Sequence, residues 1–517
     1  MTTAEFPAVP LARPIFHVGG RTIARNTVLN IVGQVAPLAV GIVTTPYVIH
    51  RLGPDRYGLL ALVWIVVGYF ALFDLGIGPA TTKFVAELLG QGRTEDLPAM
   101  VWTALATQTG TGLVAGLILA AASPALVNHL LKIPPALRTE ALWVFFILAV
   151  SFPINFATGS LRGVLAAFQR FDLVNAVGVP TAMLWYVIPV GALMLGFGLP
   201  GIVLFLVVSR VVALAAFFVF CLRICPELAH RCAFDRSLIR RLLGFGGWVA
   251  VSATLAPILI YLERFLIGAL ISVAALAYYT PAYMISSRLV IIPASLGATL
   301  FPAFSASAGR GDSEWIRNAL GRSLKSLILL LGPTSLVLAF FARPLLTLWV
   351  GPKFAAESTL VLQILAFGAF LNCLAQVPYN LVQGIGRPDL TAKFYAVETP
   401  LYVGLVWLLV SRFGLPGAAL AWAIRVSLDF VLLTLAACWL TRTPLRSLAS
   451  RDLLRSLWAL AAFATGLAIL WKSPHVLITN ACFTLLLGTG FLLSGWRYVL
   501  DGEERWHIRQ WLRGARG

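Results

Sequence analysis

Long apolar runs separated by short polar segments form the pattern of this chain from residue 26 to residue 494. The runs at 59–73 and 327–341 lack the alternation of apolar and polar residues that is typical of a transmembrane β-strand. Because only helices and closed barrels satisfy their backbone hydrogen bonds in lipid, these runs predict membrane-spanning helices. At 1.5 Å per residue, a span of about 20 residues crosses about 30 Å of hydrocarbon. We predict fourteen spans, at 26–49, 57–76, 99–122, 141–158, 174–195, 201–222, 244–262, 275–303, 321–342, 358–378, 395–411, 417–440, 456–472 and 475–494.

Composition supports an all-α membrane protein. Of the 517 residues, 59% are apolar and only 12% are charged, against about 25% charged in soluble domains. The mean hydropathy is +0.88. These values exclude a cytosolic enzyme, a secreted disulfide-rich domain and a disordered chain, and they leave a polytopic membrane protein.

Charge has an explanation in membrane topology. The chain carries 39 Lys+Arg and 21 Asp+Glu, a formal net charge of +18. With the N-terminus in the cytoplasm, 27 of the basic residues fall on cytoplasmic segments or at cytoplasmic span ends, 9 on outer loops or outer span ends, and three deep within spans. This bias follows the positive-inside rule and predicts that both termini are cytoplasmic. We therefore expect no nucleic-acid partner, and the polar first 25 residues suggest no signal peptide.

Three loop motifs recur in the same order at an offset of 216 or 217 residues, which indicates an internal duplication. Each lies in the equivalent loop of a six-span unit, and two parallel units are known in transporters. The glycines of the third motif predict positive φ angles, and the arginines of the second predict local pairing or headgroup contact. The motif pairs are Gly92-Arg93 with Gly309-Arg310, Arg170-Phe171-Asp172-Leu173 with Arg387-Pro388-Asp389-Leu390, and Phe197-Gly198-Leu199-Pro200-Gly201 with Phe413-Gly414-Leu415-Pro416-Gly417.

This duplication predicts two pseudo-symmetric six-helix lobes followed by two additional helices. The additional pair either supports one lobe or forms a lipid-tail groove or partner surface. The predicted segments are a cytoplasmic N-terminal segment (1–25), an N-lobe of spans 1–6 (26–222), a cytoplasmic linker (223–243), a C-lobe of spans 7–12 (244–440), spans 13–14 with their preceding loop (441–494) and a cytoplasmic tail (495–517).

Three arginines lie within predicted spans, where burial of a charge is costly and indicates function. Arg210 and Arg425 are 215 residues apart, so they are equivalent in the two repeats to within one residue, and Arg288 lies in span eight. A guanidinium group binds phosphate in a bidentate manner and stays charged at any relevant pH. The three arginines are therefore candidates for a cationic substrate site.

Acidic residues nearby allow a structural interpretation as well. Asp429 lies at i+4 from Arg425 and predicts an intrahelical ion pair, whereas Glu398 is placed to pair across helices. Both are candidate ion-pair or gating residues. Glu263 and Arg264, at the predicted outer end of span seven, are expected to form an interfacial pair.

Polar uncharged residues recur every four positions on single helix faces. Such faces fit either a wet, sugar-binding cavity or hydrogen bonding between helices. The cavity-lining candidates are Asn26, Asn30, Gln34, Asn372 and Gln376. Cys221, Cys225 and Cys232 match no common zinc spacing, so we predict ordinary thiols, no metal site and no cofactor.

The chain resembles the polysaccharide and O-antigen repeat-unit flippases of the multidrug/oligosaccharidyl-lipid/polysaccharide exporter superfamily. The resemblance covers roughly residues 20–440. It rests on Arg25-Asn26-Thr27 with Asn30 and Gly33, Arg51-Leu52-Gly53-Pro54-Asp55-Arg56-Tyr57-Gly58, Gly163-Val164-Leu165 with Gln169-Arg170-Phe171, Phe265-Leu266-Ile267-Gly268 with Tyr278-Tyr279, and the Gly-Leu-Pro-Gly turns.

This resemblance implies a flippase that moves a polyprenyl-diphosphate-linked oligosaccharide from the inner to the outer leaflet of the bacterial inner membrane by alternating access. It implies that the diphosphate meets a cationic cavity, for which Arg210, Arg288 and Arg425 are candidates. Lipid-linked oligosaccharide and membrane lipids are the expected partners, and a polysaccharide polymerase and glycosyltransferases of the pathway are further candidates. No long loop clusters catalytic residue types, so we expect no enzyme. A cation-coupled multidrug exporter is the alternative, although residues 26–49 contain no acid.

Overall fold

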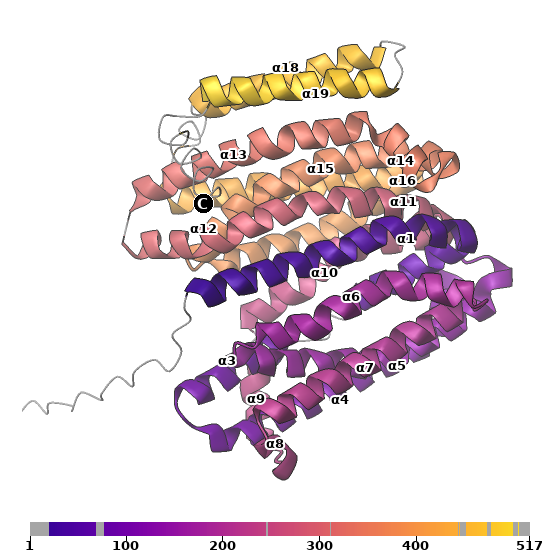
Figure 1. Cartoon of the computed structure of the whole chain (residues 1–517), viewed down its shortest axis with the longest axis vertical. Helices are drawn as coiled ribbons and strands as arrows, with labels where there is room; N and C mark the ends of the chain where they lie inside the picture. The colour runs from indigo at the N-terminus through magenta and orange to yellow at the C-terminus, as the bar shows by residue number, and fades with distance from the viewer. Residues whose placement is uncertain are drawn as a thin grey trace, which may run out of the picture. The chain divides into compact units, whose positions relative to one another are not determined.

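The computed structural model describes the backbone of residues 20–68, 77–244, 247–310, 312–442, 444, 451–472, 477–499 and 505; within these ranges, some side chains, including those of 20–35 and 243–257, lie outside the description. All regular elements in these ranges are helical, as predicted (Figure 1). By their packing they form two units. Unit 1 comprises Met1–Val48, Phe73–Ser123 and Trp143–Gly247, and unit 2 comprises Ile49–Leu72, Pro124–Leu142 and Trp248–Gly517.

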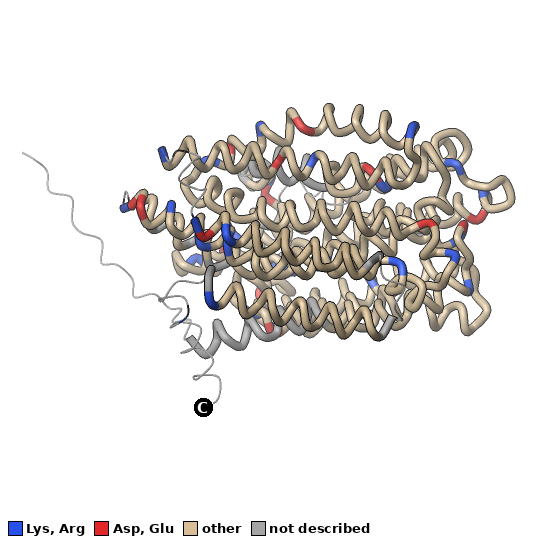
Figure 2. The backbone as a smooth tube through the Cα atoms, turned by 90° about the horizontal axis from the view of Figure 1, so that it is seen from above, with Lys and Arg blue, Asp and Glu red and all other residues tan. Residues whose placement is uncertain are grey.

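Eight helices among the described residues are long and apolar enough to cross a membrane. They run over Thr94–Leu130, Pro135–Ala167, Phe171–Met194, Leu199–Ile224, Ser313–Phe340, Pro352–Gly384, Pro388–Leu440 and Arg451–Leu470. The protein is therefore a multi-pass membrane protein. The count of fourteen spans stays a prediction, and so do the predicted lobe boundaries. Charged residues lie mainly toward the ends of the helices (Figure 2), where they can reach water.

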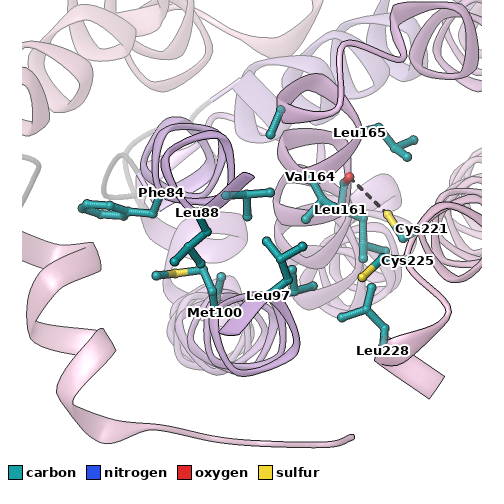
Figure 3. Packing of buried hydrophobic residues seen from close by; sticks show 14 of the residues in the cluster. Phe84, Leu88, Leu97, Met100, Leu161, Val164, Leu165, Cys221, Cys225 and Leu228 are labelled. Atoms are coloured by element: carbon teal, nitrogen blue, oxygen red, sulfur yellow. Dashed lines mark hydrogen bonds between the residues drawn. The ribbon is translucent and has the colours of Figure 1, made fainter. Parts of the chain in front are cut away.

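Unit 1 has its core among helices that pack around Leu161, Val164 and Leu165 (Figure 3). Gly112 and Gly116 allow α4 to approach α5 closely, because an added Cβ would lie 2.6 Å from Pro153 Cα and 2.6 Å from the Ala149 carbonyl oxygen. The helices of this unit are α3 (Ile77–Gly90), α4 (Leu97–Ala125), α5 (Arg138–Ala167), α6 (Phe171–Met194), α7 (Leu199–Ile224), α8 (Glu227–His230) and α9 (Arg236–Gly244), with α1 (Gly20–Gly68) shared between the units.

Unit 2 contains the C-terminal helices, and side chains cap several of their N-termini. Ser272 accepts a hydrogen bond from the Ala275 N–H at 3.0 Å, and Asp312 accepts one from the Trp315 N–H at 3.0 Å. The elements are α10 (Gly247–Leu270), α11 (Val273–Ser286), the 3₁₀ turn η4 (Ser287–Val290), α12 (Ile291–Gly309), α13 (Ser313–Phe340), α14 (Ala342–Val350), α15 (Pro352–Gly384), α16 (Pro388–Leu440), α18 (Arg451–Lys472) and α19 (Leu477–Ser494).

Two long helices bend at glycine. Gly53 in α1 has φ 71° and Gly414 in α16 has φ 60°, a backbone conformation that residues with a Cβ rarely adopt. The bend at Gly414 separates the predicted spans 395–411 and 417–440, which confirms the expected positive φ of this turn. In the first repeat, however, Gly198 is extended at φ −79°, and the positive φ lies at Gly196.

Span eight was predicted as one continuous helix over 275–303, but the structure divides it. The turn η4 interrupts it, so that α11 and α12 are separate helices. The additional helix α18 packs on α13, where an added Cβ on Gly332 would lie 2.7 Å from Leu460 Cδ1. A cavity of about 310 Å³, lined by Ser335, Gln363 and Leu457 among others, lies between α13, α15 and α18. The structure thus shows α18 supporting unit 2, beside an apolar groove.

Candidate functional site

A cavity of about 400 Å³ lies within unit 2. Its wall combines amide, hydroxyl, aromatic and charged side chains from α10, α11, η4, α15 and both halves of α16. Asn372 and Gln376, one turn apart on α15, contribute two of the cavity-lining amides expected from the sequence. The other polar lining residues are Tyr283, Ser286, Ser287, Tyr379, Tyr395, Trp422, Arg425 and Asp429.

Arg425 lines this cavity and forms an ion pair across the bend of α16. Its Nη1 lies 3.6 Å from Glu398 Oε2, and its side chain is 10% exposed. The guanidinium carbon also lies 5.6 Å from the ring centre of Tyr402. The bend at Gly414 brings the two halves of α16 together, so residues far apart in sequence become neighbours. Glu398 thus forms the ion pair between helices for which its position in the sequence made it a candidate.

Asp429 also lines the cavity, but the ion pair of Arg425 is formed with Glu398 and not with Asp429 at i+4. Asp429 is 6% exposed, and its Oδ1 has no hydrogen-bond partner among the described residues. A buried carboxylate oxygen without a donor is costly. Asp429 therefore presents an unsatisfied carboxylate oxygen beside the cavity.

Glu263 and Arg264 extend the charged group, contrary to the expected pair at the membrane interface. Glu263 is fully buried, and the Tyr402 hydroxyl donates to its Oε2 at 3.1 Å. Arg264 Nε lies 3.4 Å from Glu263 Oε1, and its guanidinium carbon lies 3.8 Å from the ring centre of Tyr283. The pairing itself is confirmed, but the predicted helix end was wrong, because α10 continues to Leu270 instead of ending at residue 262. The apolar residues that follow Arg264 were the signal that the helix continues.

Unit 2 therefore holds three carboxyl groups and two guanidinium groups that we call the charged cluster (Glu263, Arg264, Glu398, Arg425 and Asp429). Tyr402 links the pair Glu263 and Arg264 to the pair Glu398 and Arg425, and Asp429 lies one turn from Arg425 on α16. Acidic groups outnumber basic ones in this set. An incoming anion would consequently compete with carboxylates for Arg425.

Arg210 lies in unit 1, on α7, in different surroundings. Its guanidinium carbon stands 5.0 Å from the ring centre of Trp185 on α6. Within the described part of the chain, no carboxylate forms an ion pair with it. A cation–π contact stabilises a partly buried guanidinium group by about 0.5–2 kcal/mol, which leaves its charge unneutralised. Arg210 thus keeps its capacity to bind an anion.

Arg288 lies on η4 and is exposed. Its neighbours Ser286 and Ser287 line the cavity, but their hydroxyl groups donate to the carbonyl oxygens of Tyr283 and Met284, each at 3.2 Å. Both hydroxyl protons are therefore used within the helix, and the two serines have only their oxygen lone pairs left to offer to Arg288. Asn26, Asn30 and Gln34 fall in the first part of α1, where side chains lie outside the described residues.

The repeated Arg-x-Asp motif forms the same local pair in both units. Arg170 Nε donates to Asp172 Oδ1 at 2.9 Å, and Arg387 Nε donates to Asp389 Oδ1 at 2.8 Å. These hydrogen bonds raise the pKa of Arg170 and of Arg387 above the usual range. The local pairing predicted for these arginines is therefore present.

Two of the cysteines near the linker are held in the core of unit 1. Cys221 Sγ donates to the Leu161 carbonyl oxygen at 3.5 Å (Figure 3), and burial raises the pKa of the Cys225 thiol to about 11. A protonated thiol is a poor metal ligand. Among the described residues, no group of three or more His, Cys, Asp or Glu side chains is arranged to hold a metal.

Comparison with known proteins assigns the chain to a family. A family model described as polysaccharide biosynthesis protein matches residues 48–359. The chain is 26% identical to a putative O-antigen transporter of Shigella flexneri over 425 residues, which cover 80% of this chain and 97% of that protein.

Solved structures show the same fold at low sequence identity. One is an inward-facing multidrug resistance MATE family transporter, with a TM-score of 0.71, 17% identity, and coverage of 81% of this chain and 98% of that one. Another is the lipid II flippase MurJ in an inward closed conformation, with a TM-score of 0.69, 11% identity, and coverage of 92% and 99%.

Proposed function

Because the chain belongs to the polysaccharide biosynthesis protein family, we propose that it translocates a polyprenyl-diphosphate-linked oligosaccharide from the inner to the outer leaflet. Transport proceeds by alternating access between two six-helix lobes. The function named for the Shigella flexneri relative, O-antigen transport, supports this substrate class. The proposed location is the bacterial inner membrane with both termini in the cytoplasm, in line with the distribution of basic residues.

The cavity of unit 2 is the observation that carries this proposal. Asn372 and Gln376 each offer an amide donor and acceptor, and the tyrosine and serine groups add hydroxyls. Trp422 provides an apolar ring against which the flat face of a sugar can rest. Converging polar groups beside an aromatic wall form a typical small-molecule site. The cavity suits the oligosaccharide part of the substrate.

Diphosphate binding is assigned to Arg210, Arg288 and Arg425, and their surroundings rank them. Arg210 contacts an aromatic ring and forms no ion pair among the described residues, so its full positive charge is available to a phosphate. Arg425 is already paired with Glu398 and binds phosphate only by exchanging that partner. Arg288 is exposed on η4, next to two cavity-lining serines.

Sugar transfer belongs to partners in this proposal. The chain itself moves the lipid-linked unit without covalent chemistry, while a polymerase and glycosyltransferases of the pathway supply and consume it. No cofactor enters the proposed cycle. The carboxyl groups Glu398 and Asp429 act in pairing or gating of the cavity.

A cation-coupled small-molecule exporter is the second candidate, and one observation favours it. The charged cluster has more carboxyl than guanidinium groups, and such a site attracts organic cations. The amide, hydroxyl and aromatic side chains of the remaining cavity wall suit a sugar and therefore favour the oligosaccharide.

Reconstitution in liposomes tests the proposal. The substrate is a fluorescent polyprenyl-diphosphate oligosaccharide, and its arrival in the outer leaflet is read by glycosidase accessibility, with and without sodium or proton gradients. We expect flipping that requires both the sugar and the diphosphate. Gln376→Leu should slow flipping, because the sugar loses an amide partner. Asn155→Leu is the matched control, since Asn155 bonds only within its own helix, to the Ser151 carbonyl oxygen at 2.7 Å.

Two results would overturn the proposal. One is flipping no faster than in protein-free liposomes under every gradient. The other is gradient-driven export of a cationic dye by liposomes that do not flip the glycolipid, which would establish the exporter.

A further inference from the structure

Unit 1 has an apolar groove of its own, which shares no lining residue with the polar cavity of unit 2. Its volume is about 490 Å³, and it is formed by one stripe of α4 and by two residues of the segment that follows α8. The lining residues on α4 are Ala106, Thr107, Gly110, Thr111, Val114 and Ile118, and those of the linker are Phe234 and Ile239.

The walls of the groove are apolar in practice. The Thr107 hydroxyl donates to the Thr103 carbonyl oxygen at 2.7 Å, and the Thr111 hydroxyl donates to the Gln108 carbonyl oxygen at 2.9 Å. Both hydroxyls are satisfied by the backbone, so the threonines present methyl groups to the groove. Val114 and Phe234 are 58% and 55% exposed. An apolar occupant would therefore be stabilised by burying these apolar side chains. It would not need to supply a hydrogen-bond acceptor to either threonine hydroxyl.

The linker is fixed at one end of this stripe. Trp102 Nε1 donates to the Leu228 carbonyl oxygen at 3.1 Å, and the Asp235 N–H donates to Thr103 Oγ1 at 3.0 Å. Leu242 of α9 is fully buried in the core of unit 1. As a result, the segment just before α9 is tied to the first turns of α4, and α9 itself packs on α3 (Figure 1).

The same linker presents basic residues at that end. Arg236 and Arg240 lie at i and i+4 on α9, both are exposed, and neither forms an ion pair with the described residues. Asp235 accepts a hydrogen bond from the Ser237 N–H at 2.8 Å and caps the helix. This bonding to Ser237 lowers the pKa of Asp235. Even with Asp235 ionised, the two arginines leave a positive charge beside the groove.

The length of the stripe matches half a bilayer. From Ala106 to Ile118 the helix rises about 18 Å at 1.5 Å per residue, and one leaflet contributes about 15 Å of hydrocarbon. We propose that this groove is a binding site for an anionic glycerophospholipid, with one acyl chain along Gly110 and Val114 and the phosphate at Arg236 and Arg240. The lipid ties the linker to α4 from the leaflet that the linker faces, a role separate from substrate transport.

Lipid retention tests the site. The full-length protein is purified from lipid nanodiscs that contain phosphatidylglycerol and phosphatidylcholine in equal amounts, and native mass spectrometry counts the bound lipid. We expect one phosphatidylglycerol to be retained at least tenfold over phosphatidylcholine. A phosphatidylglycerol with a photoreactive acyl chain should label the peptide that contains residues 106–118.

Two variants address the two parts of the site. Gly110→Leu fills the groove without a clash at Cβ, because nothing lies within 4 Å of that position, and it should abolish retention. Arg236→Gln with Arg240→Gln should reduce selectivity for the anionic lipid at least tenfold. The matched controls are Gly178→Leu, where the added Cβ also meets nothing within 4 Å, and Arg343→Gln with Arg412→Gln, which remove two exposed arginines expected on the opposite side of the membrane.

Each of three outcomes would refute the site. Equal retention of the two lipids would show that the arginines do not distinguish the anionic headgroup of phosphatidylglycerol from the zwitterionic headgroup of phosphatidylcholine. Wild-type retention by Gly110→Leu places the lipid elsewhere. Photolabelling outside 106–118, or occupation of the groove by another segment of this chain, excludes the proposed occupant. Melting temperatures equal to the control variants show that both groove variants are folded.

Discussion

Arg210 and Arg425 occupy nearly equivalent positions of the duplicated sequence, but they have opposite surroundings. Arg210 contacts the ring of Trp185 and has no acidic partner among the described residues. Arg425 is paired with Glu398 and shares its cavity with Asp429. The two arginines thus share a position in the sequence repeat but differ in the charge around them. One copy retains an available cation, while the other is part of a cluster with excess acid.

This difference separates two roles that the sequence alone assigns to both arginines. A free guanidinium group gains most from an arriving phosphate, because it has no anion to release. A guanidinium group within a buried cluster mainly stabilises the carboxylates around it. Variants of the two residues should therefore fail in different ways.

The largest effect is expected from Arg425→Ala. Removal of one partner of a buried ion pair costs about 3–5 kcal/mol, because the remaining charge stays buried. Glu398 would lose the cation with which it is paired. We expect low abundance in membranes and a reduced melting temperature. The melting temperature is measured by size-exclusion chromatography of samples heated to increasing temperatures.

The matched rescue is Arg425→Gln combined with Glu398→Gln. This pair removes one charge of each sign and should recover most of the lost abundance. If Arg425→Ala melts like the wild type and only transport declines, Arg425 is a substrate ligand and the contrast with Arg210 disappears.

Arg210→Gln should show the reverse pattern. No carboxylate among the described residues depends on Arg210, so abundance and melting should stay near wild type. Loss of a charge-assisted hydrogen bond of about 1.5–3 kcal/mol predicts a roughly 10–100-fold slower flipping rate. Arg210→Lys should retain part of the rate, since the charge remains but the bidentate geometry is lost. A wild-type flipping rate in Arg210→Gln would remove this residue from the site.

Tyr402→Phe examines the connection within the charged cluster. Without its hydroxyl, Glu263 Oε2 loses the donor at 3.1 Å, and an unsatisfied buried group costs about 1–3 kcal/mol. We expect a lower melting temperature but measurable flipping. Tyr395→Phe is the control, because Tyr395 lies on the same half of α16 and lines the cavity of unit 2, but its hydroxyl does not donate to Glu263. Equal melting of the two variants would mean that Glu263 does not depend on Tyr402.

The all-helical membrane fold was accessible from sequence, because burial of long apolar runs in lipid leaves few alternatives. The repeat also predicted real geometry, since Gly414 has the positive φ that its turn was expected to need. The sequence does not show which acidic residue forms the ion pair with Arg425. Asp429 at i+4 is the obvious partner of Arg425, but the bend of α16 brings Glu398 closer, and local spacing does not show which residues of the two halves face each other across the bend.

Helix ends were the other weak point. The charges of Glu263 and Arg264 were interpreted as the end of a span, because isolated charges are costly in lipid. In the folded chain they are paired with each other and contacted by tyrosines, so the helix continues to Leu270. A charge inside a span marks either its end or a tertiary partner. Only the partner's position distinguishes the two.

The smallest effect should come from the two copies of the Arg-x-Asp motif, where the repeats agree. Asp172 bonds Arg170, and Asp389 bonds both Arg387 and Lys393, the latter at 3.1 Å. Exposed pairs contribute little to stability because water and salt screen them. Asp172→Asn and Asp389→Asn should both melt and flip nearly like the wild type, with the second slightly more sensitive because it releases two cations. If Asp389→Asn alone stopped flipping, the asymmetry between the repeats would extend from the buried arginines to the loops, and the loop of unit 2 would take part in transport.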